Sequence, residues 1–257
     1  MAANAGVMGR AVWIALLALL AAPTAAGGQT AVTGQRRPPT PVVVELFTAQ
    51  GCTACPDANV WAARIADREN LIVLTYPVDY WDYLGWRDTL AHPAFTNRQR
   101  MYKQRLGLKD VYTPQVVVDG RAETAATDPR RLMKLIGEQP NVIGPRVSFE
   151  ASGQRVFVAG GREPDGGAEA WLIRYDPALR TVAVRDGENK GAQVQHRNTV
   201  RELVRLGPYT GRPRAYALPP PTRSDLRTVV VVQSLRQGVL AAGRAGVRAP
   251  AAVAGRR

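Results

Sequence analysis

The chain has few of the side chains that bind metals or carry out nucleophilic catalysis. Its 257 residues include two cysteines, two histidines and four methionines. A structural zinc site would need two soft ligands besides the cysteine pair, but His92 and His196 fall in regions that we expect to be separate domains. No Met-rich or His-rich tract supports copper binding. We therefore expect no metal site and no bound cofactor.

Long apolar runs are also absent beyond the N-terminus, and a helix that crosses a membrane needs about 20 apolar residues. At the N-terminus, Arg10 precedes an apolar run at 11–22 and the small-residue stretch "PTAAGG". This is the pattern of a secretory signal peptide. We expect a signal peptide at 1–26, cleaved after Ala26, and a mature protein that is periplasmic or secreted without stable membrane insertion. A retained anchor is the alternative, and the short apolar run argues against it.

Acidic residues are the minority among the charged ones, with 21 Asp and Glu against 34 Lys and Arg and a net charge of +13. A basic chain can bind nucleic acid, acidic partners or anionic surfaces. The arginines are scattered, however, and no aromatic-basic nucleic-acid motif is present. We therefore interpret the charge as a solvated surface and expect no nucleic-acid partner. The arginine-rich tail at 244–257 is predicted to be disordered.

The spacing of apolar residues predicts an α/β fold for residues 41–140, after a linker at 27–40. β-Branched runs indicate buried strands, helical spacing with caps indicates helices, and an Asp-Gly pair indicates a hairpin turn. The order is β-α-β-α-β-β-α with an insertion after the second strand. The predicted elements are strand 41–47, helix 53–68, strand 70–78, helix 93–107, hairpin 113–124 and helix 128–139.

Beyond Pro140 the pattern changes to short strands separated by turn residues, as in "RVFVAGG", "AEAWLIRYDP" and "RTVVVVQS". This spacing is typical of an antiparallel β-sandwich or a barrel-like domain. We expect a boundary near 140–145 and a mainly antiparallel, sandwich-like β domain at 141–243. No internal repeat is present in the sequence.

Both cysteines lie in "ELFTAQGCTACP", where the first predicted strand leads into the first predicted helix. Attachment of a c-type haem would need a histidine directly after Cys55, and Pro56 stands there. A disulfide across so short a separation constrains the unfolded chain little. The start of a helix stabilises a thiolate. We therefore predict a redox pair in which an exposed Cys52 attacks and a shielded Cys55 resolves the mixed disulfide.

The segment "VDYWDYLGWRD" at 78–88 concentrates aromatic and acidic residues directly after the second predicted strand. If the first two strands are parallel, its side chains emerge at the same sheet edge as the thiols. We interpret it as a substrate platform, with Asp79 a candidate proton acceptor for Cys55. The alternative is a packed cap whose tryptophans belong to the core. The candidate platform residues are Asp79, Trp81, Asp82 and Trp86.

Other polar residues receive no functional role. We interpret His92 as a helix-entry residue, and nothing in their spacing demands a role for Glu188 or His196. The charged residues of the second predicted helix are expected to form a solvated face. These residues are Arg98, Arg100, Lys103 and Arg105.

Residues 42–138 resemble the thioredoxin superfamily, because a strand leads into "CTAC", a helix follows, and a Thr-Pro pair precedes the hairpin. The resemblance implies a cis peptide bond at Thr113-Pro114, opposite the cysteine pair. It also implies that Pro114 keeps metals away from the thiols and that Thr113 offers its backbone to a bound peptide. The implied partner is a protein thiol or disulfide.

More narrowly, the chain is similar to a family of secreted bacterial proteins described only as a domain of unknown function. The chain departs from well-studied thioredoxins at Gly51, where an aromatic residue usually stands. The buried acid of the superfamily falls on Leu46, with Glu45 beside it and expected on the other side of the strand. The stretches that carry the narrower likeness are "VELFTAQGCTACP", "DYWDYLGW", "VYTPQVVVDG", "RDGENKG" and "HRNTVREL".

The favoured function is an exported thiol–disulfide oxidoreductase that acts through Cys52 and Cys55. One alternative is a thioredoxin-like binding protein of the cell envelope, either a metallochaperone or a partner-docking module. Another is a structural envelope protein whose disulfide stays oxidised. The reduction potential of the cysteine pair separates the oxidoreductase from the structural protein. Retention of metal by the reduced protein identifies the metallochaperone.

We expect N-terminal sequencing of the protein from a periplasmic fraction to begin near Gly27. The reason is that the short apolar run ends in small residues typical of a cleavage site. Recovery of an intact Met1 on membrane-bound protein would contradict export by a cleaved signal.

Overall fold

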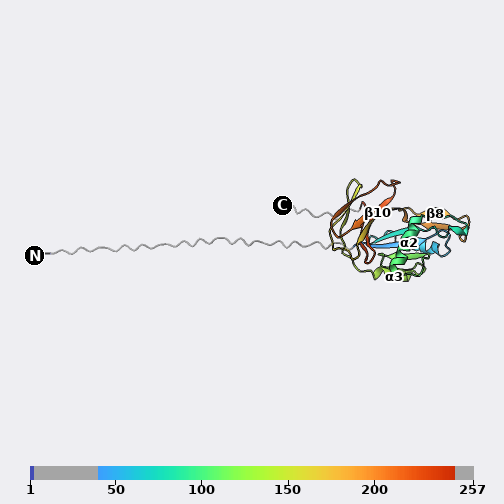
Figure 1. Cartoon of the computed structure of the whole chain (residues 1–257), viewed down its shortest axis with the longest axis horizontal. Coiled ribbons are helices and arrows are strands. Elements are labelled where there is room, and N and C mark those ends of the chain that lie inside the picture. Colours follow the sequence, from blue (N-terminus) through green and yellow to red (C-terminus); the bar gives the residue numbers. More distant parts are fainter. Residues whose placement is uncertain (3–39, 247–257) are drawn as a thin grey trace. The chain divides into compact units, whose positions relative to one another are not determined.

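The computed structural model describes residues 1–2 and 40–246, and Figure 1 shows their helices and strands coloured along the chain. The predicted signal peptide, nearly all of the predicted linker and most of the predicted tail lie outside these residues. In the described part, no helix is both long and apolar enough to span a bilayer.

The elements up to residue 137 follow the predicted order β-α-β-α-β-β-α. Gly107 ends α2 in the left-handed conformation, with φ 64°, which glycine adopts without steric cost. Asp128 caps α3 by accepting hydrogen bonds from the amides of Arg130 and Arg131 at 2.9 and 3.3 Å. The elements are β1 (Val42–Thr48), α1 (Cys55–Ile65), β2 (Leu71–Pro77), the 3-10 helix η1 (Asp82–Leu84), α2 (Pro93–Leu106), β3 (Gln115–Val118), β4 (Ala122–Ala125) and α3 (Pro129–Gly137).

Strands β1 and β2 are parallel, so their carboxyl ends lie at the same edge of the sheet. On its other side β1 pairs antiparallel with β3, and Phe47 near the end of β1 lies opposite Gln115 at the beginning of β3. This edge therefore receives three segments that the sequence had singled out. They are residues 49–55, the aromatic-acid segment 78–88 and the Thr113-Pro114 pair.

The second half of the chain does not form a domain of its own, so the predicted boundary near 140–145 is wrong. Four of its strands extend the same sheet, whose order is β13-β12-β7-β10-β2-β1-β3-β4. The halves join where β10 runs parallel to β2, with Thr199 opposite Thr75. The strands are β5 (Val147–Phe149), β6 (Arg155–Val158), β7 (Ala168–Asp176), β8 (Arg180–Ala183), β9 (Gln193–His196), β10 (Thr199–Tyr209), β11 (Arg214–Ala217), β12 (Arg227–Ser234) and β13 (Gly238–Arg244).

A second contact between the halves lies at the turn between β3 and β4. The amide of Val239 donates to the carbonyl of Asp119 in this turn at 2.8 Å. The guanidinium of Arg121 donates to the carbonyls of Gln237 and Val239 at 2.7 and 2.5 Å. Because β13 and β4 stand at opposite ends of the strand order, the sheet curves enough to bring the start of β13 against this turn.

Buried apolar residues cover both faces of the sheet. On one face, Phe95 of α2 shares a core with Val43 of β1 and Val231 of β12. On the other face, α1 and α3 cover the first-half strands through residues such as Trp61 and Leu132. The small sheet β11-β6-β5 covers β7 and β12 on that face. A two-layer β packing is therefore present, but one of its layers belongs to the long sheet.

A buried ion pair lies under α2. Side chains alternate along a strand, so Glu45 is on the same face of β1 as Phe47. The Nε and Nη2 atoms of Arg98 donate to the two carboxylate oxygens of Glu45 at 2.6 and 3.1 Å. Nη2 also donates to Gln233 on β12 at 3.3 Å, and the hydroxyl of Tyr102 donates to Glu45. The Arg98 and Glu45 side chains are 1% and 0% exposed, so the predicted placement of Arg98 on a solvated face is wrong.

The guanidinium of Arg98 remains charged in this interior. Burial lowers the pKa of Arg98, but Glu45 and the tyrosines Tyr102 and Tyr76 together hold it well above its usual value. A charge of this kind depends on its counter-charge, because an unpaired buried ion costs several kcal/mol.

Replacement Glu45→Ala is expected to lower the free energy of unfolding by about 3–5 kcal/mol, because it leaves Arg98 buried without a counter-charge. Urea denaturation measures the change. The double replacement Glu45→Leu with Arg98→Met should regain most of the loss, since a well-packed apolar pair substitutes for a buried ion pair at little cost.

The Lys134–Glu138 pair provides a control, because its side chains are 76% and 58% exposed. Lys134→Ala should change the free energy of unfolding by less than about 0.5 kcal/mol. Losses of equal size at Glu45 and Lys134 would contradict the importance of the buried pair.

Candidate active site

The two cysteines form a disulfide at the start of α1. The bond joins Cys52 to Cys55, whose Cα atoms are 5.4 Å apart. Pro56 lies in the first turn of α1, and the N-cap residue Ala54 makes no side-chain hydrogen bond. Because no side chain caps the amides at this helix end, they can stabilise a thiolate on Cys52.

Both cysteines are buried, so the prediction of an exposed Cys52 is wrong. Cys52 is 2% exposed and Cys55 is 0% exposed. They belong to the core on the α2 face of the sheet, and Tyr80 and Trp81 pack against this core. Neither cysteine therefore presents more than a small fraction of its surface to solvent.

The Thr113-Pro114 peptide bond is cis, which confirms the expectation from the resemblance. The pair directly precedes β3, at the sheet edge where β1 delivers the disulfide. The indole Nε1 of Trp81 donates to Thr113 Oγ1 at 2.8 Å. A Cβ added to Gly51 would lie 3.5 Å from Cβ of Trp81. Trp81 therefore lies between the residue before Cys52 and the Thr113-Pro114 pair.

Trp86 and two residues that the sequence did not single out hold the loop before the disulfide. The indole Nε1 of Trp86 donates to Gln50 Oε1 at 2.8 Å. Asn189 Nδ2 donates to the carbonyl oxygens of Gln50 and Cys52 at 2.7 and 2.8 Å. Asn189 lies in "RDGENKG" and stands 137 positions after Cys52. No local pattern in the sequence signals a contact over that distance.

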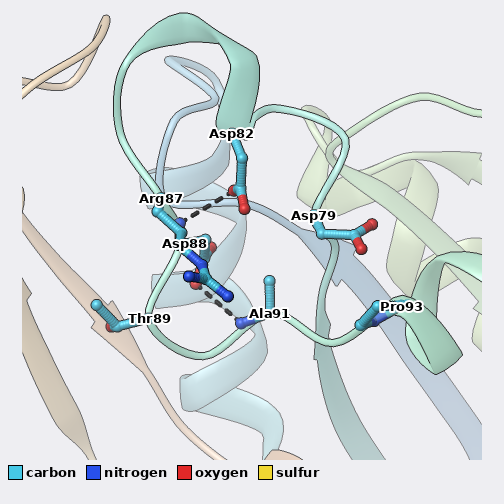
Figure 2. A pocket seen from close by; sticks show the side chains of 7 residues that line it. All are labelled: Asp79, Asp82, Arg87, Asp88, Thr89, Ala91 and Pro93. Atoms are coloured by element: carbon cyan, nitrogen blue, oxygen red, sulfur yellow. Dashed lines mark hydrogen bonds between the residues drawn. The ribbon is translucent and has the colours of Figure 1, made fainter.

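Asp79 and Asp82 line a separate cavity of about 450 Å³ (Figure 2). Thr96 Oγ1 donates to Asp79 at 2.5 Å, and Asp82 accepts from the amide of Asp88 at 3.0 Å. Neither cysteine lines this cavity, so its geometry gives no support to Asp79 as the proton acceptor of Cys55. Within 40–246, no group of three or more His, Cys, Asp or Glu side chains is placed to hold a metal ion.

Asp88 connects this cavity to the loop before the disulfide. Its carboxylate accepts from the amide of Gln50 at 2.7 Å and from the amides of Leu90 and Ala91 at 2.8 and 3.1 Å. Burial raises the pKa of Asp88 to about 6, although these hydrogen bonds act in the opposite direction. One carboxyl group therefore fixes both the end of the aromatic-acid segment and the loop that leads to Cys52.

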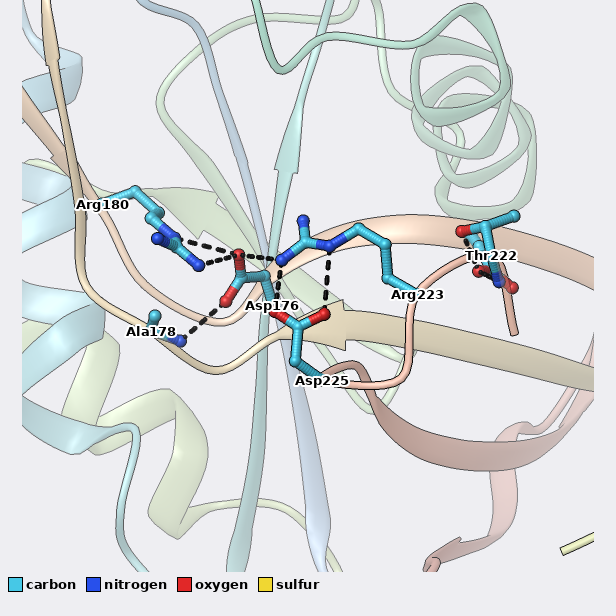
Figure 3. A network of polar contacts seen from close by, with 7 residues as sticks. Asp176, Ala178, Arg180, Thr222, Arg223 and Asp225 are labelled. Atoms are coloured by element: carbon cyan, nitrogen blue, oxygen red, sulfur yellow. Dashed lines mark hydrogen bonds and ion pairs between the residues drawn. The ribbon is translucent and has the colours of Figure 1, made fainter.

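The hairpin formed by β8 and β9 carries Asn189 and is anchored at its base. Asp176, at the end of β7, accepts from the amide of Ala178 and from Arg180 Nε, both at 3.0 Å, and from Arg223 at 3.3 Å (Figure 3). Burial raises the pKa of Asp176, but the hydrogen bonds and the nearby arginine charge bring it below its usual value. The ionised carboxylate thus fixes the point from which the hairpin leaves the long sheet.

The same hairpin packs against α1 through His196, a residue to which the sequence gave no role. Asn59 Nδ2 lies 3.5 Å from His196 Nδ1, and Thr48 Oγ1 donates to Asn59 Oδ1 at 2.8 Å. Asn59 follows Cys55 by one helical turn on the same helix face. His196 is 0% exposed, and burial lowers its pKa to about 4. The imidazole is therefore neutral at neutral pH.

The fold and the site together define an α/β protein in which a mixed sheet presents a cysteine pair at the start of a helix. The family model described as "Protein of unknown function (DUF1223)" matches residues 43–233. The chain belongs to this family, which confirms the narrower of the two resemblances. The matched region includes strands from both halves of the long sheet. A comparison with curated proteins gives no match.

Two solved structures are similar to this chain. A protein from Agrobacterium tumefaciens, determined by X-ray crystallography, is 27% identical with a TM-score of 0.63, and the match covers 81% of this chain and 95% of that one. HBP35 of Porphyromonas gingivalis is 13% identical with a TM-score of 0.51, over 80% of this chain and 74% of that one. At this identity the second likeness concerns the fold alone. Neither match stops at the first half of the chain.

The burial of His196 predicts a specific acid sensitivity. The pKa of about 4 in the folded protein lies below the ordinary value of 6.5, so unfolded chains bind a proton more readily. The contribution of neutral, buried His196 to the free energy of unfolding is fully present above pH 6.5 and is lost as the pH falls toward 4. A difference of this size corresponds to about 3 kcal/mol. Relative to a His196→Gln variant, the unmodified protein should lose stability by up to that amount over this interval.

Comparison with the His196→Gln variant is necessary because two carboxyl groups change the stability in the opposite direction as the pH falls. Burial raises the pKa of Asp88 and of Asp119 to about 6, and their protonation stabilises the fold as the pH falls. Denaturant unfolding at several pH values measures the difference. His92→Gln is the matched control, because His92 is exposed. If the two variants follow the same pH profile, burial of His196 is not the cause of the sensitivity.

Proposed function

We propose that this chain is an exported thiol–disulfide oxidoreductase with a thioredoxin-like arrangement around its cysteine pair. The observation that carries the proposal is the Cys52–Cys55 disulfide at a helix start that no side chain caps. Such a position lowers the pKa of a thiol and favours its thiolate. Export is supported by the signal-peptide pattern at 1–26, and an oxidising compartment would allow the disulfide to persist.

The thioredoxin-like part of the proposal is supported by the arrangement of the first half. Its strands lie in the order β2-β1-β3-β4, with β1 and β2 parallel and the other pairs antiparallel. Helices α1 and α3 pack on one face and α2 packs on the other. The cysteine pair and the Thr113-Pro114 pair lie at one edge of these strands, as the resemblance implies.

The proposed exchange begins when a substrate thiolate attacks Sγ of Cys52 in the oxidised protein. A bond forms between the two sulfurs, the Cys52–Cys55 bond breaks, and Cys55 leaves as a thiolate that takes up a proton. A second substrate thiolate then attacks the substrate sulfur and releases Cys52 as a thiolate. The substrate loses two electrons and gains a disulfide, while the cysteine pair gains two electrons. The reverse sequence reduces a substrate disulfide.

The burial of both cysteines favours a second candidate, a structural protein whose disulfide stays oxidised. A redox titration of the purified mature protein separates the two. Structural disulfides have reduction potentials below about −300 mV, whereas exchanging pairs lie above that value. The oxidoreductase proposal expects the higher potential, and a value well below −300 mV would favour the structural candidate.

Single cysteine variants test the assignment of the attacking and resolving thiols. Cys55→Ser should accumulate mixed disulfides with partner proteins, because Cys52 can react and nothing then resolves the product. Cys52→Ser should accumulate few. In the reduced protein at mildly acidic pH, alkylation should label Cys52 before Cys55. A depression of one pKa unit gives roughly a tenfold larger thiolate fraction. Equal labelling rates, or trapping through Cys55, would contradict the assignment.

A further inference from the structure

The loop between β8 and β9 reaches across the chain to the disulfide. Within the described residues, its hydrogen bonds to segment 49–55 come from one side chain, the Asn189 amide. This amide meets the carbonyl of Cys52, which also accepts from the amide of Cys55 at 3.1 Å. Asn189 is itself 9% exposed. The backbone turn that holds the two sulfurs is thus closed by a residue from the far half of the chain.

The loop is organised as a unit by its own backbone. The amide of Gly191 donates to Val184 at 2.8 Å, the amide of Ala192 donates to Asn189 at 2.9 Å, and the amide of Lys190 donates to Gly187 at 3.2 Å. These bonds do not involve the cysteine loop. The loop can therefore separate from the disulfide without losing its own structure.

The loop also packs against the aromatic-acid segment. Gly187 has φ 72°, and a Cβ there would lie 3.2 Å from Cβ of Trp86 and 3.4 Å from the carbonyl of Leu84. A glycine is needed both for the positive φ and for this close approach. Trp86 in turn donates to Gln50. Two segments from different halves of the chain thus meet beside the loop that carries Cys52, a residue that is 2% exposed.

We propose that residues 184–191 form a releasable cover over the disulfide, and that the Asn189 amide holds this cover closed. Asn189 is then a positioning residue that sets how readily a reaction partner reaches Cys52. The inference rests on the proposed function, because a cover has a purpose where the disulfide exchanges. Thiol–disulfide exchange requires direct approach of a thiolate to sulfur. Some partners are too large to reach Cys52 while the cover is closed. For them, the rate of thiol–disulfide exchange is proportional to the fraction of molecules in which the cover is open.

Variants at Asn189 test the cover directly. Asn189→Asp replaces the amide donor by a carboxylate that faces two carbonyl oxygens, and Asn189→Ala removes the group. Each should raise the rate at which reduced glutathione reduces the disulfide by roughly tenfold, the effect of losing one to two net hydrogen bonds on an opening equilibrium. Alkylation of Cys52 in the reduced protein should accelerate by a similar factor.

The same loop offers matched controls. Glu188 and Lys190 are exposed neighbours of Asn189, and Glu188→Ala and Lys190→Ala should leave the glutathione rate within about twofold, since surface substitutions of this kind have small effects. Trp86→Phe provides an independent test from the opposite segment, because it removes the donor to Gln50 and should also raise the rate. Circular dichroism and thermal unfolding show whether each variant is folded at the assay temperature.

The outcomes separate the cover from the proposed function. Unchanged rates in folded Asn189 and Trp86 variants would overturn the cover, and so would equal acceleration in the Glu188 and Lys190 controls. The proposed function is tested independently by the reduction potential of the unmodified protein and by mixed disulfides in Cys55→Ser. Faster reduction of Asn189→Asp together with a potential far below −300 mV would support the cover and contradict the oxidoreductase proposal.

Discussion

The buried carboxylate of Glu45 is the point on which both halves of the molecule depend. It lies on β1 and binds Arg98 of α2, which also contacts Gln233 on β12. The guanidinium carbon of Arg98 further lies 5.7 Å from the ring centroid of Trp171 on β7. One helix face therefore contacts strands from both ends of the sequence. A buried ion pair adds little net stability over a well-packed apolar pair, but either charge left without its partner is strongly destabilising. The pair consequently fixes the position of α2 across the join of the two halves.

The end of the sheet that carries the disulfide depends in the same way on residues from the second half. The carbonyl of Cys52 accepts from Asn189, and helix α1 contacts His196 through Asn59. Thr75 of β2 donates to the carbonyl of Arg197 at 2.7 Å. The second half thus completes the surroundings of the cysteine pair instead of forming an appended module. The family model likewise matches residues from both halves, at 43–233.

The elements of the first half could be predicted because their signals are local. Apolar periodicity, the Pro and Gly positions and the Asp-Gly turn specify strands, helices and caps within a few residues. The parallel pairing of β1 and β2 then places Trp81 and Trp86 at the sheet edge that carries the disulfide, and the antiparallel pairing of β1 and β3 places Thr113 there. For the aromatic-acid segment 78–88, packing on the core does not exclude a place in the wall of the site. Trp81 both packs on the core and donates to Thr113.

The features that sequence analysis missed arise from contacts between distant residues. Sequence analysis placed strands β7 and β12 in a separate β domain. Their pattern of short apolar strands between turn residues is the same whether the strands form their own sheet or extend another one. The join rests on the pairing of Thr199 with Thr75, which no local signal reports. Arg98 stands among other charged residues on its helix, and its partner Glu45 lies 53 positions earlier. The carbonyl of Cys52 accepts from Asn189, which lies farther away still.

The long separation between Cys52 and Asn189 has a consequence for the order in which the protein is made. A ribosome adds roughly 5–20 residues each second, and 137 positions separate the two residues. For roughly 7 to 27 seconds of synthesis, the chain therefore contains its cysteine pair but not the loop that carries Asn189. The hydrogen bonds from Asn189 to the carbonyls of Gln50 and Cys52 can form only after this interval. The turn that carries the cysteine pair is therefore completed by a part of the chain that is made much later than the pair itself.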